Sequence, residues 1–295
     1  AHTVLAFDGR GAARLMLPLL ALLDGTRTRD ELVATLGDAG EVAVDAALGL
    51  LEGRGLLLDG AEEPPVPQAL DNASFLSAGD PQHRPPHEIA ARLGATQVLV
   101  LGGGPVATEV ARLLRAGGIG TVERAEDDPE VEPGVDLVVA APAPHELARL
   151  ESWNRSLHNA RVPWLQLLPF DGRFAAVGPL FIPGETCCHA CYRLRRAANV
   201  FCVEEYDALS EPAAESPLSP ALLFALAGVG AHVAFAWLAY RDPQLPGVLF
   251  ALEWARTPTV TRHHVYRVPR CPVCSTAVGS PPAVWFDEER GDALV

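Results

Sequence analysis

Lysine is absent from the 295-residue sequence, so all 23 basic residues are arginine. Without lysine the chain cannot form a Schiff base with a carbonyl substrate, and no ammonium group is available to hold a nucleotide phosphate. Acidic residues outnumber basic ones, because 37 Asp and Glu give a formal net charge of −14. Nucleic acids and anionic membranes attract clusters of basic residues, so we expect neither as a partner.

Charge is also missing from one long internal stretch. Residues 216–240 contain no Asp, Glu, Lys or Arg, and such a length could cross a bilayer. No cluster of positive charge flanks it, and its small residues suit close packing, so we interpret it as a buried helix. The first ten residues lack the charged and apolar segments of a secretory signal. The sequence therefore predicts a cytoplasmic protein without a membrane span.

Residues 1–82 predict a small domain of the winged-helix type. An apolar segment at 12–23 predicts a first helix, and Thr28 with Glu31 forms a capping box that begins a second helix. A third helix is expected over 41–55, and the "LLLDG" that follows predicts a strand. Three helices followed by a strand are typical of a winged helix.

A groove between the third helix and an edge strand can accept an extended peptide as an added strand. We expect six residues to line this groove: Ala43, Ala47, Leu50, Leu51, Arg54 and Leu57. The third helix is acidic overall, which argues against a winged helix that reads DNA. The Pro- and acid-rich segment 59–70 predicts a linker to a second domain, residues 83–295.

The second domain begins with the pattern of a Rossmann-type fold. Residues 96–128 predict a strand, a glycine turn, a helix and another strand, and apolar segments at 134–144 and 162–170 predict further strands. This alternation predicts a doubly wound parallel sheet in an α/β domain. A nucleotide would bind at the turn 102–107, where backbone N–H groups face an anion. Pro105 has no N–H to donate, so we do not expect this chain to bind ATP.

Two C-x-x-C pairs, Cys188 with Cys191 and Cys271 with Cys274, indicate a metal site. Each pair places two thiolates on one tight knuckle, and two knuckles together form the tetrahedral four-sulfur site that suits zinc. Redox pairs or disulfides are the alternative, which the cytosolic character of the sequence disfavours. We predict a structural zinc that ties the end of the chain to its middle, and we expect no catalytic residue.

These features together resemble a known family. The glycine-turn unit, the segment "VGPLFIPGETCCHACYRLRR" (177–196) and the segment "HHVYRVPRCPVC" (263–274) resemble the ThiF/MoeB superfamily of ubiquitin-activating-like proteins. The N-terminal helices resemble a RiPP recognition element, a winged-helix domain that binds the leaders of ribosomally made, modified peptides. The combination is most similar to the ocin-ThiF branch of the superfamily.

The resemblance implies a leader-peptide-binding scaffold. Proteins of that branch are partners of ATP-dependent YcaO cyclodehydratases, which form azoline and thiazole rings in natural products that include thiopeptides. The four paired cysteines match the zinc ligands of the superfamily, and homodimers are usual in it. Adenylating members use an Asp near a strand end, where this chain has Ala140 and Ala141. We therefore expect no intrinsic catalysis. The alternative is an ATP-dependent adenylating enzyme that activates a peptide C-terminus.

Overall fold

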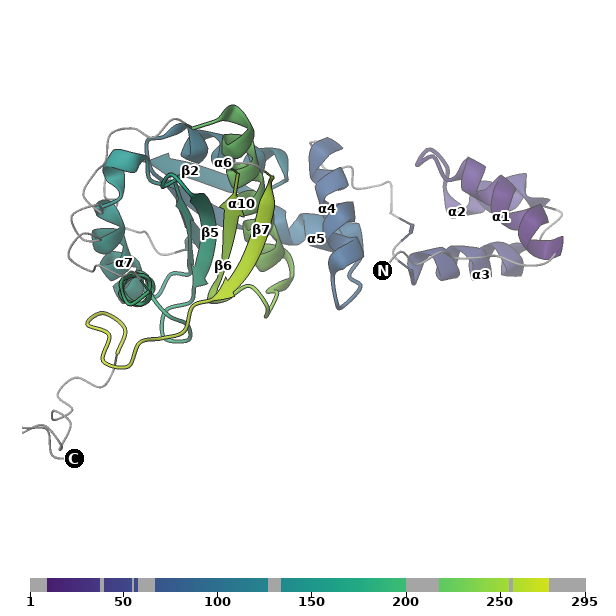
Figure 1. Cartoon of the computed structure of the whole chain (residues 1–295). Coiled ribbons are helices and arrows are strands. Elements are labelled where there is room, and N and C mark those ends of the chain that lie inside the picture. Colours follow the sequence, from purple (N-terminus) through teal and green to yellow (C-terminus); the bar gives the residue numbers. More distant parts are fainter. Residues whose placement is uncertain are drawn as a thin grey trace, which may run out of the picture. The chain divides into compact units, whose positions relative to one another are not determined.

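The computed structural model describes residues 10–37, 40–54, 56–57, 67–126, 134–199, 218–254 and 257–275. The chain divides into two compact units, one helical and one α/β (Figure 1). The helical unit takes the chain up to residue 96, together with 114–120 and 238–240. The α/β unit takes the remainder and contains the cysteine pairs and the glycine turn.

The helical unit begins with α1 (Arg10–Leu22), α2 (Arg29–Thr35) and α3 (Glu41–Glu52), which confirms the three helices predicted from the sequence. Their core consists of six buried residues: Met16, Leu19, Leu32, Val44, Ala47 and Leu51. The predicted capping box begins α2. The Glu31 N–H donates to Thr28 Oγ1 at 3.4 Å, and the Thr28 N–H donates to Glu31 Oε2 at 2.8 Å. Two N–H groups at the helix start are thereby satisfied.

The predicted strand after the third helix is not seen at Leu56 and Leu57, which have no regular structure, and residues 58–60 lie outside the described part of the chain. The winged helix therefore stays a prediction. α4 (Pro67–Gly79) begins inside the expected linker, so residues 67–70 are helical. α5 (Pro86–Gly94) follows it closely.

The turn between α4 and α5 is held by a buried ion pair. Asp80 accepts hydrogen bonds from Arg84 Nε at 2.6 Å and Arg84 Nη2 at 2.9 Å. It also accepts from the backbone N–H groups of Gln82 and Arg84. The carboxylate is thus fully hydrogen-bonded, as a buried charge must be.

The α/β unit contains a seven-stranded sheet with the order β2-β1-β3-β4-β5-β6-β7. The strands are β1 (Gln97–Leu101), β2 (Thr121–Ala125), β3 (Leu137–Ala140), β4 (Trp164–Leu168), β5 (Phe174–Phe181), β6 (Val248–Glu253) and β7 (Thr259–His264). The first four are parallel, as predicted, but β5, β6 and β7 are antiparallel. The turn between β4 and β5 is too short to hold the crossover that a parallel pair requires, so the sheet is mixed.

Helices cover both faces of this sheet, as a doubly wound fold requires (Figure 1). They are α6 (Pro105–Ala116), α7 (Arg149–Ala160), α8 (His189–Ala197) and α10 (Pro220–Tyr240). α7 contributes Leu150, Trp153 and Leu157 to a core that includes Trp164 of β4. On the other face, Gly230 of α10 lies so close to Leu167 that an added Cβ would come within 2.6 Å of its side chain.

α10 corresponds to the charge-free stretch of the sequence. Among the described residues it is the one helix long and apolar enough to cross a membrane, and 56% of its most apolar window is buried inside the protein. Leu222, Leu226 and Ala234 are among its buried residues. This burial fits the buried helix expected from the sequence.

Candidate metal centre and glycine turn

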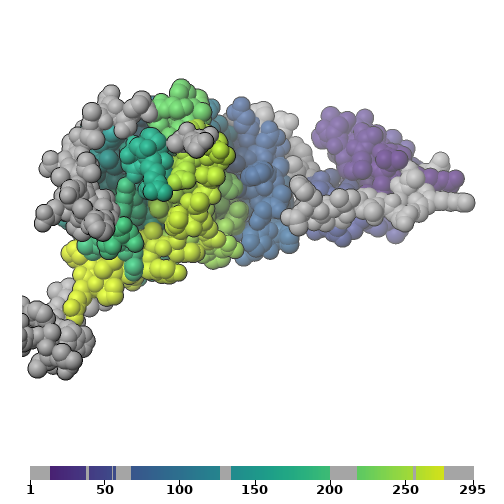
Figure 2. All heavy atoms as spheres, in the orientation of Figure 1, coloured from purple at the N-terminus to yellow at the C-terminus, as the bar shows by residue number. Residues whose placement is uncertain are grey.

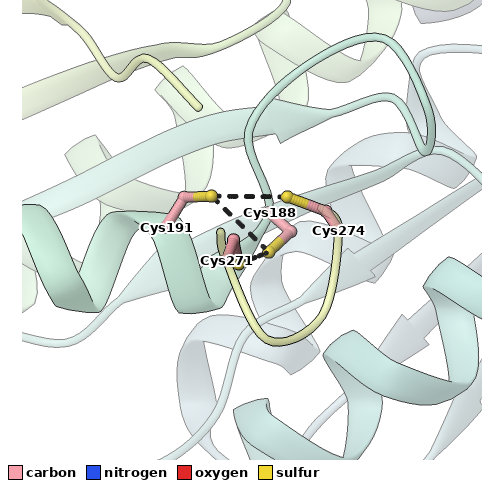
Figure 3. Close-up of side chains that lie close together, drawn as sticks. All are labelled: Cys188, Cys191, Cys271 and Cys274. Carbon is pink, nitrogen blue, oxygen red and sulfur yellow. Dashed lines mark hydrogen bonds between the residues drawn. The ribbon is translucent and has the colours of Figure 1, made fainter. Parts of the chain in front are cut away.

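The two cysteine pairs come together in one buried group (Figure 3). Cys188 and Cys191 belong to the start of α8, and Cys271 and Cys274 belong to the loop that follows β7. The Sγ···Sγ distances are 3.6 Å for Cys188–Cys271, 3.4 Å for Cys191–Cys274 and 3.9 Å for Cys188–Cys191. All four sulfurs lie within 4.8 Å of one another, so the structure joins the two knuckles as predicted.

These distances fit a metal and not a disulfide. Tetrahedral zinc with Zn–S bonds of about 2.3 Å separates its sulfur ligands by about 3.8 Å, whereas a disulfide joins sulfurs at about 2.05 Å. The four described sulfurs are free thiols at the separations that a shared tetrahedral ion requires. The group can therefore hold a metal such as zinc, and with four protein ligands its coordination would be closed, as in structural sites.

Hydrogen bonds from two arginine side chains connect the segments that carry the two knuckles. Arg195 of α8 donates to the carbonyl oxygens of Tyr266 at 2.5 Å and Arg267 at 2.9 Å. Arg267 in turn donates to the carbonyls of Gly184 at 2.9 Å and Cys274 at 2.6 Å. The two arginines thus connect residues near both ends of the cysteine group, which orients the ligands as outer-shell contacts of metal sites do.

The cysteines differ in how readily they lose a proton. A hydrogen bond from Cys188 lowers the pKa of Cys191, and the Val268 N–H also donates to the Cys191 sulfur at 3.3 Å. Burial raises the pKa of Cys187 to about 12, so this neighbour stays a thiol. Cys187 is not among the four grouped sulfurs. Cys202 lies outside the described residues.

His189, between the first two ligands, belongs to a buried polar network. Its backbone N–H donates to Asn154 Oδ1 at 3.0 Å, and its Nδ1 lies 2.8 Å from Gln166 Oε1. Burial lowers the pKa of His189 to about 4, so the ring is neutral near pH 7. The network joins α7, β4 and α8 next to the cysteine group, which indicates a positioning role.

The glycine turn follows β1 and leads into α6, as predicted. Gly102 has a φ of 122°, and an added Cβ there would collide with the Ala141 carbonyl, so only glycine fits. Pro105 is the first residue of α6 and has no N–H to donate. The turn therefore keeps the Rossmann backbone but offers fewer donors to an anion.

A carboxylate of the protein itself occupies the donor side of this turn. Glu146 Oε2 accepts the Gly103 N–H at 3.1 Å and the Ala143 N–H at 2.8 Å. The Glu146 side chain is only 8% exposed, and Arg149 Nη1 lies 3.3 Å from its Oε1. A phosphate at this turn would have to displace a buried, hydrogen-bonded carboxylate.

Sequence reasoning missed Glu146, which stands 43 positions after Gly103. The sequence around Glu146 indicates only a local contact. Glu146 ends the short 3-10 helix η2 (Pro144–Glu146), where it accepts the Ala143 N–H. A second carboxylate, Glu126, has its side chain beside Gly103. Each of these carboxylates has an arginine partner, since Arg149 lies 3.3 Å from Glu146 and Arg124 lies 3.9 Å from Glu126.

The six expected groove residues lie on different sides of α3 and the segment after it. Ala47 and Leu51 are core residues of the helical unit, so their side chains do not form a surface. Leu50 and Arg54 are exposed, while Ala43 and Leu57 are half-buried. Sequence reasoning did not identify the exposed apolar face of α3, which consists of Val42, Ala46 and Leu50 at helical spacing. The sequence could have revealed this face, because its three positions lie opposite the core positions of α3 on the helix.

The fold and the cysteine group define a Rossmann-type α/β protein with a four-cysteine group that can hold a metal ion and with an N-terminal helical unit. No protein-family model matches the sequence, and no curated protein does. Solved structures do match. The heterocyclase TruD is 27% identical with a TM-score of 0.66, over 92% of this chain and 39% of that chain.

Two further structures share the fold. A heterocyclase in complex with substrate and cofactor is 20% identical with a TM-score of 0.70, over 92% of this chain and 36% of that chain. MccB of E. coli with ATP is 15% identical with a TM-score of 0.57, over 88% of this chain and 91% of that chain. The chain thus spans less than two-fifths of each of the two heterocyclases and most of MccB.

Proposed function

We propose that this protein is a leader-peptide-binding scaffold that recruits a ribosomal precursor peptide to a separate ATP-dependent YcaO cyclodehydratase, which forms the azoline or thiazole rings. In this proposal the chain is an ocin-ThiF-like subunit that does not itself bind ATP. The observation that carries the proposal is the hydrogen bond from the Gly103 N–H to the Glu146 carboxylate.

The glycine turn at 102–107, which Glu146 closes, favours a role without ATP for three reasons. Glu146 already accepts two backbone N–H groups, which a phosphate would need. Pro105 supplies no donor, and the sequence has no lysine to replace it. The end of β3 carries Ala140 and then Ala141, neither of which can hold a metal ion that would neutralise a triphosphate. A nucleotide here would lack several of the donors that a phosphate ordinarily receives.

The similarity to heterocyclases supports a role in peptide heterocycle formation. The match to TruD covers nearly all of this chain but only 39% of that chain. We propose that the matching region serves peptide binding, and that a YcaO-type partner supplies the ATP-dependent chemistry. Holding the leader raises the local concentration of the core peptide at the partner's active site.

The proposed leader site lies on α3 and the residues after it. Leu50, Arg54, Ala43 and Leu57 would contact the peptide, while Ala47 and Leu51 would support the helix from the core beneath. Val42, which is 84% exposed, extends the apolar face toward the start of α3. Apolar side chains exposed along one helix face suit the anchors of a bound peptide.

The test is fluorescence anisotropy with a labelled leader peptide from a neighbouring precursor gene, titrated with the full chain. We expect saturable binding that Leu50→Glu weakens at least about tenfold, because a charge on the apolar face must be desolvated. Leu17→Glu is the matched control, since Leu17 is an exposed leucine of α1 (69% exposed) and should leave binding unchanged. Equal loss in both variants, or no binding by the wild type, would contradict this site.

An adenylating enzyme is the second candidate, and the similarity to MccB with ATP favours it. ATP–pyrophosphate exchange distinguishes the two, with MccB as the positive control. We expect no exchange above background in this protein at millimolar ATP with the leader peptide present. Exchange comparable to that of MccB would support the adenylating enzyme and would refute the proposal that this glycine turn does not bind ATP.

We also propose a homodimer. Phe224 on α10 is 58% exposed, whereas Leu222 and Leu226 of the same helix are buried. Light scattering of the purified chain should give twice the monomer mass, and Phe224→Glu should shift it to the monomer mass. A monomeric wild type at micromolar concentration would refute this expectation.

A further inference from the structure

β7 offers an open strand edge. It is the last strand of the sheet and pairs with β6 alone among the described residues. All six of its residues are exposed, and the yellow-green segment to which it belongs forms part of the surface in Figure 2. Such an edge can accept a further strand from another chain.

The register of β7 determines which backbone groups face outward. The Val265 N–H donates to the Gly247 carbonyl at 2.9 Å, so the pair His263–Leu249 is a hydrogen-bonded pair. The alternate residues then direct their N–H and C=O groups away from β6. These residues are Val260, Arg262 and His264.

An arginine-lined pocket of about 690 Å³ lies at the end of β7. Its walls are the end of α8, the start of β5 and the residues after β7. Three arginines line it against one acidic residue: Arg173, Arg195 and Arg196 against Asp171. The rings of Phe174, Tyr192 and Tyr266 also line it. The pocket is thus positively charged in a chain with a net charge of −14.

The three arginines differ in their partners. Arg196 pairs with Asp171 at 2.6 Å, and Arg173, whose side chain is 80% exposed, reaches Glu253 at 3.4 Å. Arg195 donates to two backbone carbonyls and has no carboxylate partner among the described residues. One positive charge therefore remains uncompensated by the described side chains, and a second is only weakly held.

We infer that the α/β unit carries a second peptide site, in which an extended acidic peptide pairs with the outer edge of β7 and places carboxylates in the arginine pocket. The free edge selects a peptide, because its hydrogen bonds match an extended backbone. The arginines select acidic side chains, because a guanidinium matches a carboxylate in geometry and charge. Alternate side chains of an added strand would face the side of His263, which lines the pocket.

This site is independent of the proposed leader site on α3, because all its residues belong to the α/β unit. The probe is a fluorescein-labelled peptide of five Glu-Thr repeats, and its matched control is a peptide of five Gln-Thr repeats. Anisotropy is measured with the full chain at low and high salt. We expect saturable binding of the Glu-Thr peptide, at least tenfold tighter than the Gln-Thr peptide, and weaker binding at high salt.

Two variants test the two halves of the site. Arg173→Gln removes a pocket charge from an exposed position and should weaken binding at least threefold. Val260→Pro removes one outward-facing N–H and breaks no hydrogen bond to β6. Edge strands tolerate such a proline, and the change should weaken binding about tenfold. Arg112→Gln, on the surface of α6 outside the pocket, is the charge control and should have no effect. Leu50→Glu should also have no effect, which separates this site from the leader site.

Several results would overturn the inference. Equal binding of the Glu-Thr and Gln-Thr peptides would show that the arginines do not select carboxylates. Full binding by Val260→Pro, with circular dichroism showing an intact fold, would show that β7 is not the docking edge. Complete competition by millimolar inorganic phosphate, together with full binding by Val260→Pro, would identify a small-anion site instead. Loss of binding in Arg112→Gln would show that the attraction is non-specific.

Discussion

The Glu146 carboxylate accepts the backbone N–H of Gly103 at 3.1 Å, across 43 positions of sequence. This contact places a negative charge where a Rossmann turn ordinarily receives phosphate. The same oxygen accepts the Ala143 N–H, so one side chain joins the loop after β1 to the loop after β3. Glu146 thereby holds the glycine turn against the loop after β3, and this contact stabilises the α/β unit.

Glu146→Ala is expected to destabilise the α/β unit by about 2 kcal/mol, because two backbone donors lose their acceptor in a buried position. Glu146→Gln should cost less, since its carbonyl oxygen can still accept. Thermal unfolding followed by circular dichroism measures both. Glu126→Gln is the control, because that side chain is 72% exposed and should change little. An unchanged melting temperature in Glu146→Ala would contradict this stabilising role of Glu146.

The cysteine group is expected to bind one zinc ion per chain, measured by elemental analysis of the purified protein. Cys188→Ser and Cys274→Ser should each lose the metal and lower the melting temperature, because both sulfurs belong to the group. Cys187→Ser is the matched control and should keep the metal, since Cys187 is adjacent in sequence but outside the group. Metal should also be released as pH falls, because protons compete for the thiolates. Metal loss in Cys187→Ser alone would refute the assignment.

The Asp80–Arg84 pair is expected to make stability depend on acid pH. The hydrogen bond from Arg84 lowers the pKa of Asp80 from 3.8 to about 2. A lowered pKa in the folded state means that the pair stabilises above pH 4, and that this contribution is lost as pH falls toward 2. The shift corresponds to about 2 kcal/mol. Urea unfolding between pH 6 and pH 2 should show this loss in the wild type.

Asp80→Asn should abolish that part of the pH dependence and cost about 3 kcal/mol at pH 7, because it leaves the buried Arg84 without its partner. Asp30→Asn is the control, since the Asp30 side chain is 89% exposed. A variant as stable as the wild type at pH 7 would show that the pair contributes nothing.

Two glycines of α10 are expected to respond oppositely to alanine. Gly228 has no atom within 4 Å of an added Cβ, so Gly228→Ala should stabilise by about 0.5–1 kcal/mol through helix propensity. At Gly230 an added Cβ would lie 2.6 Å from the Leu167 side chain. Gly230→Ala should therefore destabilise by about 1–2 kcal/mol. Thermal unfolding of the two variants measures the difference. The same sign of effect in both would contradict the packing of α10 on β4.

Much of the fold could be predicted from local patterns. The capping box at Thr28 is a contact between residues three positions apart, so the sequence contains both partners. The parallel strands followed from apolar runs separated by helical segments. The antiparallel β5 and β6 could not be predicted in the same way, because their pairing depends on partners far along the chain, such as Val177 with Phe250.

The candidate site shows the same division. The cysteine pairs could be recognised because each knuckle is a local motif, and zinc chemistry requires two of them. Which α3 side chains point inward and which point outward could not be predicted from the sequence, because both faces of that helix carry apolar residues. Leu51 lies in the core while Leu50 is exposed, and only the packing of α1 against α3 distinguishes them.

The sequence by itself determined the strand–turn–helix unit, the pairing of thiols within each knuckle and the lack of lysine, because these are properties of neighbouring residues or of composition. Only the tertiary structure decided that Glu146 closes the glycine turn and that arginines from α8 and from the turn before β5 gather at the end of β7. Those contacts join residues that the chain separates by tens of positions, and their positions depend on how the strands order within the sheet.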